Sequence, residues 1–293
     1  MKSIDIIGFG LAALALMTDM MGESSPAVRR GSAQISDPVL DIIKATGHAE
    51  GGFDAVNGNV GSHEGVSFGI LQWTQGSGNL GIVLQAMQAT SPSIFAQILG
   101  PSWAAVLKVA VDSKDKNVQR TVDGKKLWEE PWISKFRLLG QNATMQLGQI
   151  SAARNGVFMR EALRGAEKLG LEPTMHVVGV LFDRAVQNGH NGLKGAVEDV
   201  SERLAQQDTG EADTGADLDE DDVLRMVIQR LARPFRRSTA PAPEDDPKGR
   251  WRQVGREWHK FHGTGVDLYT DTIRRGELTL ANGALRRDVR VES

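Results

Sequence analysis

A short glycine-rich segment interrupts an otherwise helical pattern near the start of this chain of 293 residues. Residues 51–66, GGFDAVNGNVGSHEGV, contain five glycines and two asparagines. This composition is typical of turns and of a short, irregular β-hairpin rather than of a helix. On both sides, apolar residues recur with helical spacing. The sequence therefore predicts a mainly α (α+β) protein with one small β-hairpin near its start.

The segment before the hairpin carries the signals of a helix. Ser36-Asp37-Pro38 combines a capping residue with a proline in the first turn. Apolar residues then follow at Val39, Leu40, Ile42 and Ile43. We expect this helix to run to about Ala49 and to place Glu50 at its C-terminal end.

Beyond the hairpin, Ser67–Trp73 (SFGILQW) is a compact apolar stretch, and the rest of the chain is mostly helical in pattern. Residues 79–89 place Leu80, Val83, Leu84 and Met87 on one helical face. Further helices are expected at 92–100, 102–112, 131–164 (interrupted), 173–188, 191–206, 220–233 and 248–262.

Changes in composition divide the chain into four parts. Residues 1–35 contain the apolar run Ile6–Met17, which is too short to span a bilayer, so no membrane span is expected. This run suits either a signal peptide or a helix packed on the domain. Residues 36–206 form the expected main domain, 207–222 an acidic linker, and 223–293 a C-terminal helical region. The linker is expected because eight acidic and no basic residues lie between 208 and 222.

Composition also excludes several classes of site and partner. The absence of cysteine rules out disulfides, cysteine-ligated zinc, iron–sulfur clusters and thiol nucleophiles. A formal net charge of -3 gives no reason to expect nucleic acid as a partner. His190 has no second ligand at the usual spacing, so no metal and no cofactor are expected.

The acidic residues around the hairpin are the candidate catalytic groups. Cleavage of a glycosidic bond uses one carboxyl that donates a proton and a second that activates water or acts as nucleophile. Glu50, between Ala49 and Gly51, has no bulky neighbour that would block a polymer. For the second carboxyl we prefer Glu64, with Asp54 or no protein carboxylate as alternatives. We expect the Glu50 and Glu64 carboxyls to face each other across a cleft, ~6.5–9.5 Å apart.

Five polar or aromatic residues are candidates for binding the substrate: Asn57, Ser67, Gln72, Trp73 and Asn188. Trp73 would stack on a sugar face or, beside Ile70 and Leu71, belong to the core. The amide of Gln72 would bind a sugar or the hairpin backbone. Asn188, with His190 and Asn191, would line the cleft opposite the hairpin.

Two further pairs of residues stand out in the predicted helices. Asp183 and Arg184 interrupt an apolar helix, and we favour a buried ion pair that joins helices over a solvated pair. Arg154 and Asn155 are candidates for orienting Glu50 or Glu64.

Glu50 followed by Ser67-Phe68-Gly69-Ile70-Leu71-Gln72 resembles the lysozyme superfamily, in which a glutamate ends a helix and a serine-containing G-x-x-Q stretch follows. The superfamily includes goose-type lysozymes, lytic transglycosylases, phage endolysins and family 46 chitosanases. Residues 67–85, 146–171 and 177–192 are similar to chitosanase segments, so the resemblance spans roughly 36–205. It implies a lysozyme-like helical domain in which the hairpin forms one wall of the cleft.

The resemblance also implies an activity, with one departure. The chitosanase base is an aspartate, whereas Ser62, His63 and Glu64 stand here, so Glu64 would substitute for it. The hairpin is poor in acids, which favours peptidoglycan over cationic chitosan. We therefore expect a glycosidase that acts on a polysaccharide by inverting chemistry, and secreted or periplasmic if its substrate is the cell wall. A lytic transglycosylase, a chitosanase, and an inactive scaffold or wall-binding protein are the alternatives.

Overall fold

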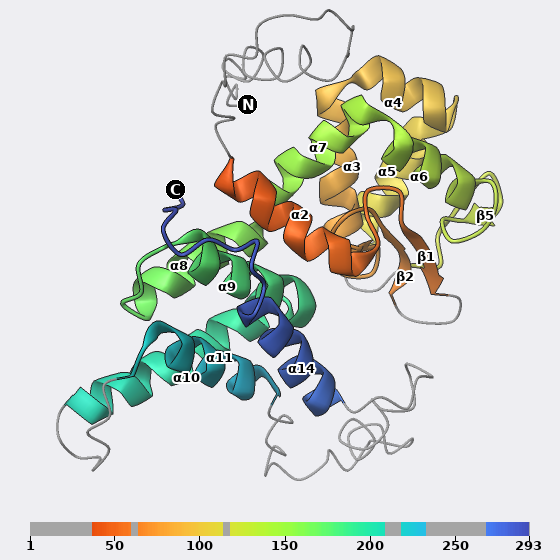
Figure 1. The fold of residues 1–293 in the computed structure, drawn as a ribbon. Helices are drawn as coiled ribbons and strands as arrows, with labels where there is room; N and C mark the ends of the chain where they lie inside the picture. Colours follow the sequence, from red (N-terminus) through yellow and green to blue (C-terminus); the bar gives the residue numbers. More distant parts are fainter. Residues whose placement is uncertain (1–36, 60–63, 114–117, 209–217, 233–267, 293) are drawn as a thin grey trace, which may run out of the picture. The chain divides into compact units, whose positions relative to one another are not determined.

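Helices make up most of the chain that the computed structural model describes, namely residues 37–59, 64–113, 118–208, 218–232 and 268–292 (Figure 1). The first helices are α2 (Pro38–Glu50), α3 (Asn79–Thr90), α4 (Pro92–Leu99), α5 (Trp103–Asp112), α6 (Trp132–Gln141) and α7 (Ala143–Arg154). The later ones are α8 (Val157–Lys168), α9 (Met175–Asn188), α10 (His190–Asp208), α11 (Glu220–Ala232) and α14 (Leu268–Leu280). The predicted mainly α class with a small sheet is confirmed.

Helix α2 begins and ends where its sequence signals predict. The Asp37 side chain accepts a hydrogen bond from Leu40 N at 3.2 Å, and Pro38 occupies the first turn. At the other end Gly51 adopts the left-handed conformation, with φ 111°, and its N–H donates to the carbonyl of Gly47. A glycine terminates the helix there because residues with a Cβ rarely adopt this conformation. Glu50 is therefore the last residue of α2.

A three-stranded antiparallel sheet follows, in the order β1 (Val56–Asn59), β2 (Gly65–Phe68) and β3 (Trp73–Thr74). Its register pairs Val56 with Phe68 and Asn59 with Gly65. The predicted hairpin is confirmed, but its second strand continues to Phe68, beyond the expected end at residue 66. A second hairpin, β4 (Thr121–Val122) and β5 (Lys125–Lys126), was not predicted.

Two glutamine side chains fasten the turn after Glu50 to the sheet. Gln149 of α7 is fully buried; its amide donates to Phe53 O at 2.9 Å and accepts from Ile70 N at 3.0 Å. Gln72 donates to Gly69 O at 3.1 Å and to Ala55 O at 3.3 Å. These bonds hold the end of α2 against the β-region.

A close approach between α6 and the same turn requires a glycine at position 140. A Cβ on Gly140 would lie 2.2 Å from Phe53 O and 2.4 Å from the Cα of Asp54. Both are backbone atoms and have little freedom to move aside. In α10, by contrast, a Cβ on Gly195 would meet nothing within 4 Å.

Gly140→Ala should lower the free energy of unfolding by about 1–3 kcal/mol, because the added methyl group forces the turn away from α6. Gly195→Ala is the matched control and should raise it by roughly 0.5–1 kcal/mol, as alanine favours the helix. Urea unfolding of both variants measures the difference. Equal stability of the two would show that the close packing at Gly140 is unimportant.

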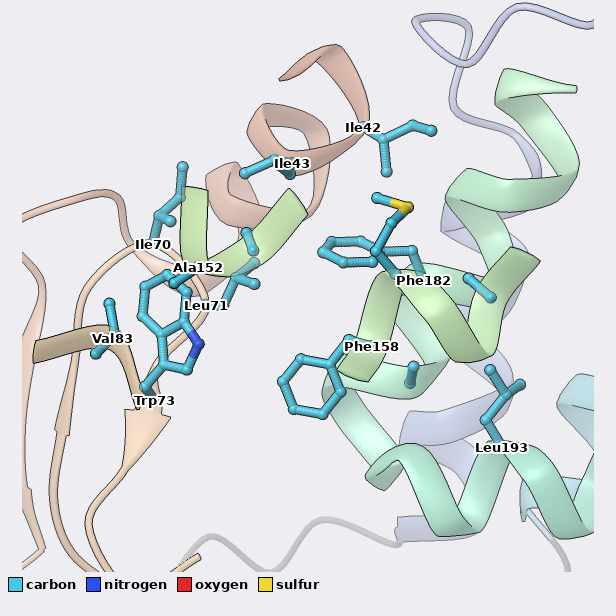
Figure 2. Close-up of a cluster of buried hydrophobic side chains, with 14 of the residues drawn as sticks. Ile42, Ile43, Ile70, Leu71, Trp73, Val83, Ala152, Phe158, Phe182 and Leu193 are labelled. Carbon is cyan, nitrogen blue, oxygen red and sulfur yellow. The ribbon is translucent and has the colours of Figure 1, made fainter. Parts of the chain in front are cut away.

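The core joins α2 and the sheet to the later helices (Figure 2). Ile42 and Ile43 of α2 are fully buried, as is Phe182 of α9. Trp73 is only 4% exposed and lies beside Leu71 in this core. The α3 residues predicted to share a face, Leu80, Val83, Leu84 and Met87, are all fully buried.

Helix α9 lies at the centre of the second group of helices. Every residue from Met175 to Ala185 is buried, and α9 packs against α2, α8, α10, α11 and α14. The C-terminal helices thus belong to the same unit, Asp37–Ser293, as the predicted main domain. Within the described ranges, no single helix is long and apolar enough to cross a bilayer, although α4 and α5 meet that test together as a pair bent by 96°.

The expected helix 220–233 is observed as α11, which begins inside the expected linker 207–222. Glu220, Asp221 and Asp222 form the first turn of α11, where carboxylates interact favourably with the helix dipole. Most of the linker (209–217), the N-terminal segment 1–35 and the predicted helix 248–262 lie outside the described residues.

The C-terminal segment after α14 covers the start of α9. The carbonyl of Val289 accepts from Met175 N at 2.6 Å, and that of Arg286 accepts from His176 N at 3.0 Å. Arg287 in this segment donates to Glu220 at 2.9 Å and to both carboxylate oxygens of Asp221 at 2.8 and 3.0 Å. The backbone donors at the start of α9 are thereby satisfied, and α11 is tied to the C-terminus.

The ion pair between Arg287 and Asp221 should make the free energy of unfolding depend on pH in the acid range. Partial burial raises the pKa of Asp221, but hydrogen bonds from Arg287 and His176 outweigh this, so the pKa lies below its ordinary value of 3.8. A carboxylate with a lowered pKa stabilises the fold fully above its ordinary pKa. This contribution is lost as the pH falls through the lowered pKa.

Arg287→Gln should therefore cost about 0.5–1 kcal/mol at pH 7, a value typical of exposed ion pairs, and progressively less below pH 4. Denaturant unfolding of both proteins between pH 2 and pH 7 measures the difference. A difference that stays constant over this range would contradict the assigned pairing.

Candidate functional site

Glu50 is held by donors from two later helices. Its Oε1 accepts a hydrogen bond from Gln187 of α9 and an ion-paired hydrogen bond from the guanidinium of Arg275 of α14, 2.9 Å away. The Glu50 side chain is 16% exposed. Among the described residues, its other oxygen, Oε2, has no hydrogen-bond partner. One oxygen of Glu50 is thus held by two side chains from later helices.

The guanidinium of Arg275 is anchored in turn by Asp183. The same nitrogen that contacts Glu50 lies 2.7 Å from Asp183 Oδ1. Asp183 Oδ2 accepts from Arg184 and from the Thr279 hydroxyl, the latter at 2.8 Å. Asp183 and Arg184 are 1% and 0% exposed, so the predicted buried ion pair is confirmed.

The cluster sets guanidinium groups against carboxyl groups. Burial raises the pKa of Asp183, but the charges of Arg184 and Arg275 outweigh it, so the pKa is lowered and the group is ionised. Burial lowers the pKa of Arg275, but Asp183 and Glu50 outweigh it and the pKa is raised. Burial lowers the pKa of Arg184, which nevertheless stays charged because a guanidinium does not deprotonate in proteins. The ionised Asp183 and the carboxyl group of Glu50 thus face two guanidinium groups.

The two candidates for the second carboxyl lie at different places. Glu64 is exposed and precedes β2, at the end of the ladder where Asn59 pairs with Gly65. Phe68 pairs with Val56 at the other end of this ladder. Glu64 therefore lies about 13 Å from Phe68 along the strand direction. Asp54 is exposed in the turn after α2 and accepts a hydrogen bond from Gln141 at 3.2 Å.

The five candidate binding residues are not equally accessible. Asn57 is exposed on β1, and Asn188 is partly buried at the end of α9, with an oxygen that lacks a partner. Ser67 is 6% exposed in the middle strand, and Trp73 is a core residue. The Gln72 amide binds the hairpin backbone. Burial leaves Ser67 and Trp73 without a free face for a sugar, and the expectation that they bind one does not fit the fold.

The residues expected to orient the catalytic groups lie elsewhere. Arg154 pairs with Asp37 at the start of α2, and Asn155 donates to Ser151 O at 3.1 Å. Among the described residues, Glu50 forms no hydrogen bond or ion pair with either of them. The contacts of Glu50 come instead from Gln187 and Arg275, which the sequence reasoning missed. The sequence offered one signal for these contacts. Asp183 was expected to be buried beside a single arginine, and a buried carboxylate needs further donors from other helices.

One group in the described ranges has the composition of a metal site. Ligand atoms of His176, Glu220 and Asp221 lie within 4.8 Å of one another. The guanidinium of Arg287 already contacts both carboxylates and supplies the positive charge there. The arrangement therefore acts as an ion-pair cluster.

A groove of about 850 Å³ lies between α8 and the C-terminal segment. Its walls include Arg160, Arg164 and Arg290 but neither Glu50 nor Glu64. The groove is thus separate from the predicted catalytic residues.

Comparison with protein-family models finds no match, and comparison with curated proteins finds none either.

Proposed function

We propose that this protein is a glycoside hydrolase of the lysozyme-like kind that cleaves β-1,4-linked amino-sugar polymers, with peptidoglycan as the preferred substrate. The observation that carries the proposal is the environment of Glu50. This carboxyl ends a helix beside a small sheet, has one oxygen fixed by two donors, and its other oxygen has no hydrogen-bond partner among the described residues.

Glu50 has the role of general acid in this proposal. In a carboxylic acid the carbonyl oxygen accepts hydrogen bonds and the hydroxyl donates. With Oε1 occupied by donors, the transferable proton is on Oε2. It passes to the glycosidic oxygen as the bond from that oxygen to the anomeric carbon breaks, and water adds to the sugar.

Glu64 is the proposed base, and its position also supports a variant of the reaction. An inverting pair is separated by ~6.5–9.5 Å, with a water between the carboxyls. Glu64, at the far end of the β1–β2 ladder, is a candidate for the distant partner. If Glu64 lies too far from Glu50 to hold that water, Glu50 acts alone, as in a lytic transglycosylase, which adds no water to its product.

Digestion of purified peptidoglycan and of chitosan, followed by mass analysis, tests the proposal. We expect soluble fragments from peptidoglycan that carry one added water for each bond cut. Fragments without that water would identify the transglycosylase variant, and cleavage of chitosan alone would change the substrate. No fragments from either polymer would contradict the proposal.

A parallel digestion with Glu64→Gln and Asp54→Asn separates the candidate bases. If Glu64 activates the water, Glu64→Gln loses hydrolysis and Asp54→Asn keeps it. Retained cleavage in both variants supports chemistry with a single protein carboxyl.

A further inference from the structure

Gln187 is the more exposed of the two side chains that contact Glu50 Oε1. It lies one helical turn after Asp183 on α9, so both side chains are on one face of that helix. Asp183 is buried and acts through Arg275, whereas Gln187 is exposed and donates directly to Glu50 Oε1.

We propose that Gln187 is a positioning residue that completes a two-donor clamp on Glu50 and so confines the transferable proton to Oε2. This inference rests on the proposed function. The terminal torsion of a glutamate is broad and nearly two-fold, so a free carboxyl exchanges its two oxygens readily. Arg275 of α14 and Gln187 of α9 converge on one oxygen and prevent that exchange.

The chemistry of an amide suits this position. With Glu50 protonated, the guanidinium groups of Arg184 and Arg275 already face the single carboxylate of Asp183. A third cation would leave excess positive charge beside the acid and would disfavour its protonated form. The amide of Gln187 supplies a donor without charge, and its position at the surface places it beside an approaching polymer.

The test compares Gln187→Leu, which removes the donor, with Gln187→Glu, which replaces it by a second carboxylate. Gln97→Leu is the matched control, because Gln97 is an exposed glutamine on α4. We expect kcat for peptidoglycan cleavage to fall about 10- to 100-fold in Gln187→Leu with little change in KM, as for a misplaced catalytic group. In Gln187→Glu the basic limb of the pH–rate profile should move to higher pH, since two adjacent carboxyls share a proton.

A second measurement reports the contact without any substrate. The side-chain NH₂ signals of Gln187 in a ¹⁵N-labelled sample should be displaced downfield by the carboxylate and return to ordinary positions in Glu50→Ala. Ordinary signals in the wild type would overturn the clamp. Displaced signals with an unchanged kcat and pH profile in the Gln187 variants would overturn its role in catalysis.

A wild-type protein that releases no fragments from any glycan would refute the proposed function itself, and this inference with it. That result can be distinguished from failure of the clamp alone, because it is seen in the wild-type protein without any substitution. Activity that is lost only in the Gln187 variants, with the melting temperature and the Gln97→Leu control unchanged, supports the clamp.

Discussion

Replacing Asp183 by alanine should lower the free energy of unfolding by about 3–5 kcal/mol. Asp183 is 1% exposed and accepts from Arg184, Arg275 and Thr279. Without it the fully buried Arg184 keeps only its hydrogen bond to the carbonyl of Thr272, at 3.1 Å, and its charge is uncompensated. The loss is large because the desolvation cost of the guanidinium remains.

Denaturant unfolding of Asp183→Ala measures this cost, and Asp199→Ala is the control. Asp199 pairs with Arg230 between α10 and α11, and both side chains are more than a third exposed. Exposed pairs contribute ~1 kcal/mol or less, so the control should change little. Similar losses of unfolding free energy in the two variants would mean that the buried cluster contributes no more to stability than an exposed ion pair does.

The same variant links stability to the site. Arg275 contacts Asp183 and Glu50 through one nitrogen, so the loss of Asp183 frees the guanidinium from its buried anchor. In a folded Asp183→Ala protein, at a temperature where it stays native, glycan cleavage should therefore fall as well.

Local signals predicted the parts of the fold that are encoded by neighbouring residues. Asp37 and Pro38 fix the start of α2, Gly51 fixes its end, and helical spacing identifies the buried face of α3. The glycine-rich composition of residues 51–66 predicted the hairpin. These features depend on contacts within a few residues, which a sequence pattern records directly.

The partners of Glu50 were not predictable in this way. Gln187 is 137 residues from Glu50, and Arg275 is 92 residues from Asp183. Helix α14, which carries Arg275, was not predicted; the helix expected in that region, 248–262, lies outside the described residues. Packing of α14 on α9 brings these residues together, and no local pattern reports such packing.

Residue type alone left the roles of single side chains open. Tryptophan is common at sugar-binding sites, yet Trp73 follows Ile70 and Leu71 and is buried with them. The acids of 220–222 belonged both to the expected linker and to the expected helix 220–233; at the first turn of α11 they interact with the helix dipole, and two of them pair with Arg287. In both cases the surroundings in the fold decide the role.

Glu50→Gln tests the central claim most directly, through the rate at which the protein releases fragments from purified peptidoglycan. Glutamine keeps the shape of the side chain and can still accept from Gln187 and Arg275, but it has no acidic proton to transfer. We predict that the rate falls ~10²–10⁴-fold while the melting temperature changes little. A rate within a few-fold of the wild type, in a variant that is equally folded, would contradict the assignment of Glu50 as the general acid.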